Sequence, residues 1–185
     1  MLRKHFLLSV LLTVAFGTGS AFAAVQNLTL SPGNTQAYLH ARSAVTDVDG
    51  TFSEVSGHLD YDLEHQTCHV DLTMDVSSLK VGSAVMKQIM LSGIMLDSDA
   101  HPTMHYVGDC RPRVVNGQVQ GQLVGMLTMR GQTHPVTFAS RMQFSGNTLR
   151  RIVSTATFDQ RKWGVSTLLR SVNPMVRSET VIELK

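Results

Sequence analysis

The sequence contains few cysteines, few charged residues and almost no net charge. Among 185 residues there are two cysteines, 16% of the residues are charged, and the formal net charge is +2. Two cysteines are too few for a four-cysteine zinc site or a disulfide-dense scaffold. A nearly balanced charge gives no basic surface of the kind that binds nucleic acid, and we expect no nucleic-acid partner. The apolar content of 43% excludes a disordered chain.

The sequence also lacks the motifs of common catalytic sites. No G-x-S-x-G pattern marks a nucleophilic serine, and no glycine-rich phosphate-binding loop occurs. We therefore expect a protein that is not an enzyme and that has no cofactor. After the N-terminal region, no stretch is long and apolar enough to span a bilayer, which takes about 20 residues.

Residues 1–23 have the pattern of a secretory signal peptide. Arg3 and Lys4 precede an apolar run from Phe6 to Phe16, and Ala21-Phe22-Ala23 has the small residues of a cleavage site. A retained N-terminal anchor is the alternative, but the apolar run is short for a membrane span. We expect cleavage after Ala23, an exported domain over residues 24–185, and no stable membrane span after cleavage.

The rest of the chain alternates apolar and polar residues with a period of two, which is typical of half-buried strands. Leu59 and Tyr61, for example, share one face, and His58 and Asp60 share the other. Strands that hide one apolar face must form a closed antiparallel barrel or a sandwich. The pattern predicts about eight strands, over Thr35–Ala44, Val55–Leu63, Cys68–Val76, Thr103–Cys110, Val119–Met129, Val136–Phe144, Ile152–Phe158 and Thr180–Leu184.

One region departs from this alternation. Between about residues 83 and 96, apolar residues such as Met86, Ile89 and Met90 are spaced three and four apart, which predicts a short amphipathic helix.

The predicted inward positions are mostly leucine, valine and methionine, but they also include glycines. Gly57, Gly108, Gly121 and Gly125 fill no volume, so an apolar cavity is one interpretation of the pattern. Relief of strain at bends and bulges explains the same glycines equally well.

The two cysteines fall on strands that are able to pair. If Met74 lies opposite Met104 in an antiparallel pair, the same register places Cys68 opposite Cys110 on the apolar face. Opposed residues satisfy the requirement that bridged Cα atoms lie within about 7 Å. We expect a disulfide between Cys68 and Cys110; two buried free thiols are the alternative.

Several motifs, in this order and spacing, resemble the YceI-like family of exported bacterial proteins. The resemblance covers about Gln36 to Leu184 and rests on Asp49–Phe52, Gly57–Asp62, Asp75–Leu79, Leu96-Asp97, His101-Pro102 and Gly125–Val136. It implies a periplasmic, lipocalin-like antiparallel barrel that binds a polyisoprenoid or similar lipid in an interior tunnel, without catalysis. The segment Val81–Met90 departs from the family because it is more apolar and rich in methionine, whose flexible side chain suits an irregular lipid chain.

Taken with the apolar interior, the resemblance predicts a site for an apolar lipid such as an isoprenoid quinone or a polyprenol. The predicted lid residues are Met86, Ile89, Met90 and Ile94. The oligomeric state is open, and a homodimer is compatible with the sequence. The predicted tunnel wall consists of Leu59, Leu72, Met74, Met104, Tyr106, Leu123, Leu127 and Phe138.

Two other functions remain open at this point. Met95, His101, Met104 and His105 carry thioether and imidazole groups, which select Cu(I). Met104 and His105, however, point to opposite faces of one predicted strand, and we expect no metal site. The other alternative is a barrel with a fully packed interior that serves as a partner-binding module.

Overall fold

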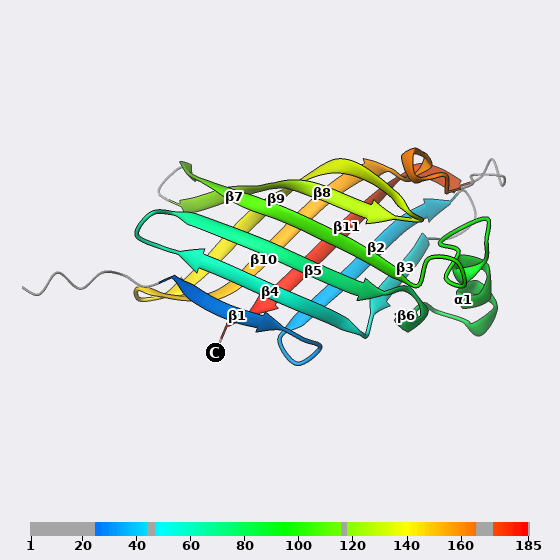
Figure 1. Ribbon diagram of the computed structural model, residues 1–185, viewed down its shortest axis with the longest axis horizontal. Coiled ribbons are helices and arrows are strands. Elements are labelled where there is room, and N and C mark those ends of the chain that lie inside the picture. Colours follow the sequence, from blue (N-terminus) through cyan, green and yellow to red (C-terminus); the bar gives the residue numbers. More distant parts are fainter. Residues whose placement is uncertain (1–24, 44–46, 116–117, 166–171, 185) are drawn as a thin grey trace, which may run out of the picture.

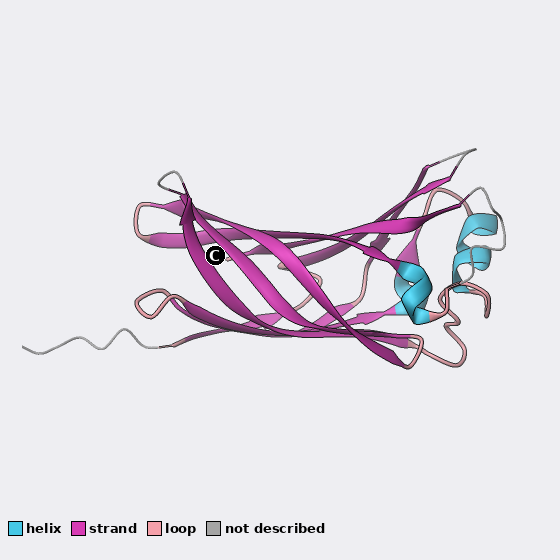
Figure 2. Cartoon of the chain, turned by 90° about the horizontal axis from the view of Figure 1, so that it is seen from above, coloured by secondary structure: helices cyan, strands magenta, loops and turns pink. Residues whose placement is uncertain are grey.

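The computed structural model describes residues 25–43, 47–115, 118–165 and 172–184, and the predicted signal peptide lies outside these ranges. The described residues form one antiparallel sheet that curls into a half-barrel (Figure 1). The strands are β1 (Gln26–Leu30), β2 (Thr35–Ser43), β3 (Asp47–Phe52), β4 (Val55–Asp62), β5 (Thr67–Asp75), β6 (Leu79–Lys80), β7 (Thr103–Val115), β8 (Gln118–Met129), β9 (Gln132–Ser145), β10 (Thr148–Asp159) and β11 (Val172–Glu183). Their hydrogen-bonded order is β1-β4-β5-β7-β8-β9-β10-β11-β2-β3-β6. The helical segments gather toward one end of the half-barrel (Figure 2).

The predicted all-β antiparallel class is confirmed, but the predicted count of eight strands is corrected to eleven. Strands β1 and β6 are too short to produce a clear alternation. Strand β3 contains Asp49-Gly50, a pair typical of turns, yet both residues lie inside the strand and pair with His40 and Leu39 of β2. The order of the described strands leaves β1 and β6 as edges. The sheet is therefore a curled half-barrel and not the closed barrel predicted from the sequence.

The pairing of β5 with β7 has the register predicted from the sequence. Met74 lies opposite Met104, and Leu72 lies opposite Tyr106. Continuing this register brings the cysteines together, and Cys68 and Cys110 form a disulfide with their Cα atoms 4.8 Å apart. The match follows from geometry, because a slip by one residue would turn every apolar side chain of the strand to the solvent.

A short 3-10 helix, η1 (Val76–Ser78), connects β5 to the edge strand β6. The Asp75 carboxylate accepts hydrogen bonds from the backbone N–H groups of Ser77 (2.7 Å) and Ser78 (3.3 Å). The Ser78 hydroxyl accepts a bond from the backbone N–H of Glu54, 3.1 Å away, at the corner between β3 and β4. The Asp75–Leu79 motif therefore fixes a corner of the fold.

A second 3-10 helix, η2 (Gln160–Trp163), packs against the sheet at the same end. The Trp163 side chain is fully buried, and its indole Nε1 donates a hydrogen bond to the backbone oxygen of Leu127 at 3.0 Å. Its ring packs edge to face against Phe158, with centroids 5.1 Å apart. Trp163 thus anchors the chain between β10 and β11 to the core.

The helix α1 (Ala84–Leu91) is shorter than the predicted range of 83–96. It begins after Ser83, whose hydroxyl accepts a hydrogen bond from the backbone N–H of Met86. After Leu91 the chain folds back, and the N–H of Leu96 donates to the oxygen of Met90 at 3.0 Å. Within the described ranges, no helix has the length and apolar character needed to cross a membrane.

Candidate functional site

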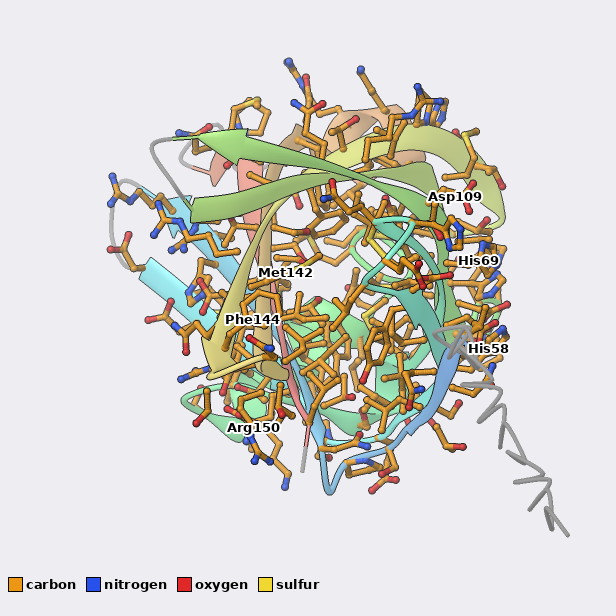
Figure 3. The ribbon with its side chains drawn as sticks, turned by 90° about the vertical axis from the view of Figure 1, so that its left-hand side faces the viewer. His58, His69, Asp109, Met142, Phe144 and Arg150 are labelled. Atoms are coloured by element: carbon orange, nitrogen blue, oxygen red, sulfur yellow. A yellow bond between two sulfur atoms is a disulfide. The ribbon has the colours of Figure 1, made fainter. Side chains whose placement is uncertain are left out.

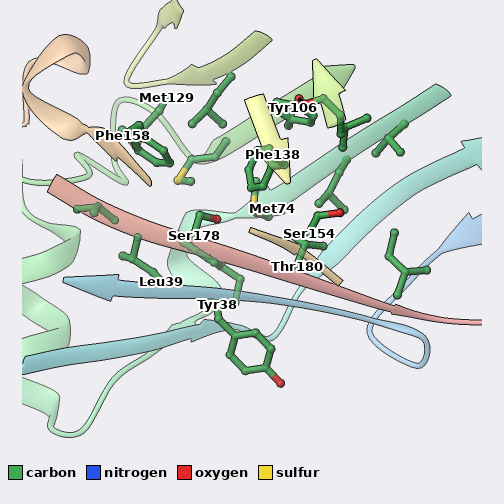
Figure 4. A pocket seen from close by; sticks show the side chains of 18 of the residues that line it. Tyr38, Leu39, Met74, Tyr106, Met129, Phe138, Ser154, Phe158, Ser178 and Thr180 are labelled. Carbon is green, nitrogen blue, oxygen red and sulfur yellow. Dashed lines mark hydrogen bonds between the residues drawn. The ribbon is translucent and has the colours of Figure 1, made fainter. Parts of the chain in front are cut away.

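The inward face of the half-barrel encloses an elongated cavity, here called the bore (Figure 4). Every predicted wall residue lines it, and none of these side chains is more than 6% exposed. They come from β4, β5, β7, β8 and β9: Leu59, Leu72, Met74, Met104, Tyr106, Leu123, Leu127 and Phe138. The alternation in the sequence thus placed these eight residues correctly on one surface; their contact with a ligand remains a prediction.

The lining of the bore also carries hydroxyl groups, on β9, β10 and β11, that were not among the predicted site residues. Ser140 of β9 and Ser154 of β10 are both buried, and their hydroxyls lie 2.7 Å apart in a hydrogen bond. Ser178 and Thr180 of β11 continue this row along the wall. The period of two could have found them, because Ser140 follows Val136 and Phe138 at the same spacing. The row adds polarity to the bore without adding charge.

The inward glycines at the centre of the sheet make room for a tyrosine and not for a ligand. Gly108 lies directly opposite Gly125, and the Tyr106 ring lies over both. A Cβ atom added to Gly108 or Gly125 would lie 2.8 or 2.7 Å from the Tyr106 hydroxyl. That hydroxyl is 3.0 Å from the backbone oxygens of Leu123 and Val136, its hydrogen-bond acceptors. Burial raises the pKa of Tyr106, so the hydroxyl stays protonated.

Glycine is needed at position 57 for a different reason, which is also unrelated to a cavity. Its φ of +146° is open to glycine and strained for other residues. An added Cβ atom would lie 2.0 Å from the backbone oxygen of Asp71 on the neighbouring strand. At the three inward glycines for which the contacts are defined, close packing is therefore the explanation.

The bore is narrow in this conformation. Only about 60 Å³ of it is wide enough for the centre of a water molecule. Ligand pockets commonly hold about 300 Å³ or more. Several of the lining side chains are the flexible thioethers of Met74, Met90, Met95, Met104 and Met129. Because methionine changes rotamer at little cost, such a lining is able to widen around a chain.

The predicted lid is only partly at the bore. Of its four residues, Met90 lines the cavity and Met86 is half-buried against the core. Ile89 and Ile94 are 41% and 52% exposed and do not line it. The reason is the early end of α1, which turns residue 94 away from the position that a longer helix would give it. Met95 and Leu96 close the bore instead.

Arg130 ties this closing segment to the turn between β8 and β9. Its Nη1 donates hydrogen bonds to the backbone oxygens of Gly93 (2.9 Å) and Met95 (2.6 Å). Arg130 and Gly131 both have positive φ values, which shape the turn. The His101 ring lies over Gly131, where an added Cβ atom would be 3.0 Å from its Cε1. Together these contacts fix the segment that closes the bore at its α1 end.

A second cavity opens at the end of the half-barrel opposite to α1, and we call it the mouth (Figure 3). About 370 Å³ of it is open to water-sized molecules. The mouth and the bore share Cys68, Cys110 and Ile152 as lining residues, so the two cavities meet at the disulfide. The other residues that line the mouth are Tyr61, Asp62, Leu63, Gln66, Thr67, Met142, Phe144, Gly146, Asn147 and Leu149.

Sequence reasoning missed the mouth as a site. Most of its residues lie at strand ends and in the turns after β4 and β9, where the alternation stops. Its one signal was the pair Gly146-Asn147, which marks a turn but not the side chains that gather beside it.

The Asp62 carboxylate lines the mouth and is held by hydrogen bonds within the turn that follows β4. The Asp62 side chain is 9% exposed, and its Oδ1 accepts hydrogen bonds from the backbone N–H groups of Glu64 (2.9 Å) and His65 (3.0 Å). Its Oδ2 lies 2.7 Å from Nδ1 of His65. These bonds, the His65 N–H foremost, keep the pKa of Asp62 below its ordinary value, and the hydrogen bond to Asp62 raises the pKa of His65.

The residues considered for copper lie in different places: Met95 and Met104 line the bore, whereas His101 and His105 do not. Met104 faces the bore, whereas His105 lies outside, with its Nε2 2.8 Å from Oδ1 of Asp71. His101 lies beside Asp97, 3.9 Å away. In the part of the chain that the structure describes, no group of three or more histidine, cysteine, aspartate or glutamate side chains is arranged to hold a metal ion.

Comparisons with solved structures find a similar fold in three bacterial proteins. Burkholderia cenocepacia BcnA superposes with a TM-score of 0.73 at 16% identity, covering 82% of this chain and 96% of that one. A polyisoprenoid binding domain from Saccharophagus degradans gives a TM-score of 0.61 at 10% identity, covering 88% and 100%. Campylobacter jejuni YCEI protein gives 0.58 at 14% identity, covering 74% and 84%.

At such identities these likenesses establish the fold alone. A search of curated proteins finds no match. The sequence model of the YceI-like domain, in contrast, matches residues 28–185, which is most of the chain. The chain therefore belongs to the YceI-like family.

Proposed function

We propose that this protein is an exported, non-catalytic carrier that holds the long apolar chain of a polyisoprenoid lipid inside the bore. The observation that carries the proposal is the continuity of the lining, which runs from Met90 at the α1 end past the disulfide to the mouth. Family membership and the structural likeness to the polyisoprenoid binding domain from Saccharophagus degradans support it.

Desolvation supplies the binding energy in this proposal. About 20 buried methylene equivalents contribute about 16 kcal/mol before the cost of ordering the chain and the protein is subtracted. The bore residues contribute no formal charge, so an apolar chain meets no unpaired ion there. The hydroxyls of Ser140 and Ser154 bond to each other, which satisfies part of their hydrogen-bonding capacity without a ligand.

Uptake of a lipid requires the bore to widen. The narrow space between its side chains has to open by rotation of the methionines, whose thioether chains adapt to irregular shapes. The protein then behaves as an induced-fit binder, and the empty form is more compact than the loaded one.

Export is part of the proposal. Residues 1–23 supply the signal peptide, and the disulfide between Cys68 and Cys110 suits an oxidising compartment such as the periplasm. Cell fractionation with an antibody, and N-terminal sequencing of the exported form, test both points; retention of residues 1–23 would contradict them.

The narrow bore also favours a second candidate, a partner-binding module whose interior is simply packed. Native mass spectrometry and organic extraction of protein purified without refolding separate the two. A carrier yields a bound lipid, or takes up a polyprenol offered in detergent. A packed module yields no lipid and takes up none.

A bore-filling substitution locates the binding. Ser154→Phe places an aromatic ring among the inward residues of β10, and we expect polyprenol affinity to fall at least tenfold. Thr157→Phe on the same strand is the matched control, because residue 157 is exposed. Circular dichroism of both variants checks that the fold is kept. Equal polyprenol binding by both would place the lipid elsewhere.

A further inference from the structure

We propose that the mouth is a headgroup site, and that it selects lipids whose polar end is uncharged over lipids that end in a phosphate. This inference rests on the carrier function proposed above. It adds a direction of binding, with the chain in the bore and the polar end at the mouth, and a chemical class for that polar end.

The two ends of the bore differ in how open they are. The α1 end is closed by Met90, Met95 and Leu96 and is tied by the hydrogen bonds of Arg130 to Gly93 and Met95. The mouth offers about 370 Å³, compared with about 60 Å³ in the bore. The end with more space is therefore the one that accepts the bulkier group of the ligand.

The two cavities also differ in their polar groups. The mouth has the side-chain amides of Gln66 and Asn147 and the hydroxyl of Thr67. These three side chains make no hydrogen bond to any described residue, and all three are exposed, so their donors and acceptors are free for a ligand. Amides and hydroxyls offer both donors and acceptors, which suits an alcohol, a phenol or a quinone carbonyl.

The charge of the mouth opposes an anionic headgroup. Asp62 contributes a carboxylate, and no lysine, arginine or histidine is among the described residues that line this cavity. The nearby imidazole of His65 is bonded to Asp62. A phosphate placed there would lie beside the Asp62 carboxylate, and no lysine or arginine of the described lining would compensate the two like charges, which is unfavourable in a partly buried site.

The apolar part of the mouth agrees with this assignment. Leu63, which follows β4, and Phe144 of β9 both line the mouth, and each is 41% exposed. Met142 and Phe144 lie beside the opening in Figure 3, whereas Arg150 lies at the outer side of this end. Arg150 is exposed and does not line the mouth. Because it is a cation at this end of the half-barrel, the test has to show whether phosphate binding depends on it.

The test compares two probes with the same chain, geranylgeraniol and geranylgeranyl monophosphate, by competition against a fluorescent polyprenyl analogue. We expect the wild-type protein to bind the alcohol at least tenfold more tightly than the phosphate. Asn147→Lys puts a cation at the mouth and should raise the affinity for the phosphate, relative to that for the alcohol, about tenfold. Gln143→Lys, on β9 between two mouth residues but outside the cavity, is the control and should change neither.

Three outcomes overturn the inference while leaving the carrier function intact. The first is phosphate binding equal to or tighter than alcohol binding. The second is phosphate binding that depends on Arg150, shown by its loss in Arg150→Ala. The third is an Asn147→Lys variant that folds and binds both probes as the wild type does. Failure of the wild-type protein to bind either probe would instead contradict the carrier function.

Discussion

Cys68 is joined to Cys110 at the place where the bore and the mouth meet. The two residues belong to β5 and β7, and their bond closes a loop with a sequence separation of 42. The disulfide thus has a structural role in the sheet and also lines the junction of the two cavities.

Removal of this disulfide should destabilise the protein. For Cys68→Ser with Cys110→Ser we expect a loss of about 2 to 4 kcal/mol in the free energy of unfolding, because the unfolded chain regains the entropy of the open loop. Urea denaturation of the variant and of the reduced wild type measures it. Equal midpoints with and without reductant would show that the thiols are not bridged in the purified protein.

The glycine pair beneath Tyr106 should not tolerate a methyl group. Gly125→Ala would bring a Cβ atom to 2.1 Å from the backbone oxygen of Val107, so the strands have to shift, and we expect a loss of about 2 kcal/mol or more. Gly82→Ala is the control, because nothing lies within 4 Å of its added Cβ atom. Thermal unfolding of both variants compares them; a fully stable Gly125→Ala would show that the close approach is absent.

Loss of the Arg130 side chain should loosen the α1 end without unfolding the sheet. Arg130→Ala removes two hydrogen bonds to backbone oxygens, worth about 1 to 2 kcal/mol in all. We expect faster amide hydrogen exchange over residues 90–97 and unchanged exchange in β5. Arg177→Ala, which removes a pairing with Glu179 on the surface, serves as control. Unchanged exchange over 90–97 would contradict the role of Arg130.

The turn at the mouth should depend on pH through Asp62 and His65. The raised pKa of His65 means that its contribution is fully present below about 6.5 and is lost as the pH rises through the folded-state value. The lowered pKa of Asp62 means that its contribution is present above about 3.8 and is lost as the pH falls through the folded-state value. The turn is therefore most stable between these two limits.

NMR titration of the Glu64 and His65 amides measures this dependence. His65→Ala should remove the upper transition and leave the lower one at Asp62. His58→Ala, which changes a histidine outside the mouth, is the control. An upper transition that persists in His65→Ala would assign it to another group.

The sequence was sufficient for those features that follow from regular alternation. The β5–β7 register, the disulfide and the eight wall residues all depend on which face a side chain occupies, and a period of two specifies that face. The short strands β1 and β6 carry too few residues to show the period.

Features that depend on turns and on three-dimensional packing could not be predicted in this way. Gly108 and Gly125 suggested empty volume, because the sequence does not reveal that the Tyr106 ring lies over them. Arg130 reaches the segment after α1 across 35 or more residues of chain, and the mouth assembles from strand ends that are distant in sequence. Long-range contacts of this kind have no local pattern.

The most direct test of the carrier function is a crystal structure of the exported protein purified without refolding and incubated with a polyprenol. We expect continuous elongated density in the bore, from Met90 past the disulfide to the mouth, with the methionine side chains moved aside. A bore filled by its own side chains, with no ligand density after incubation, would contradict it.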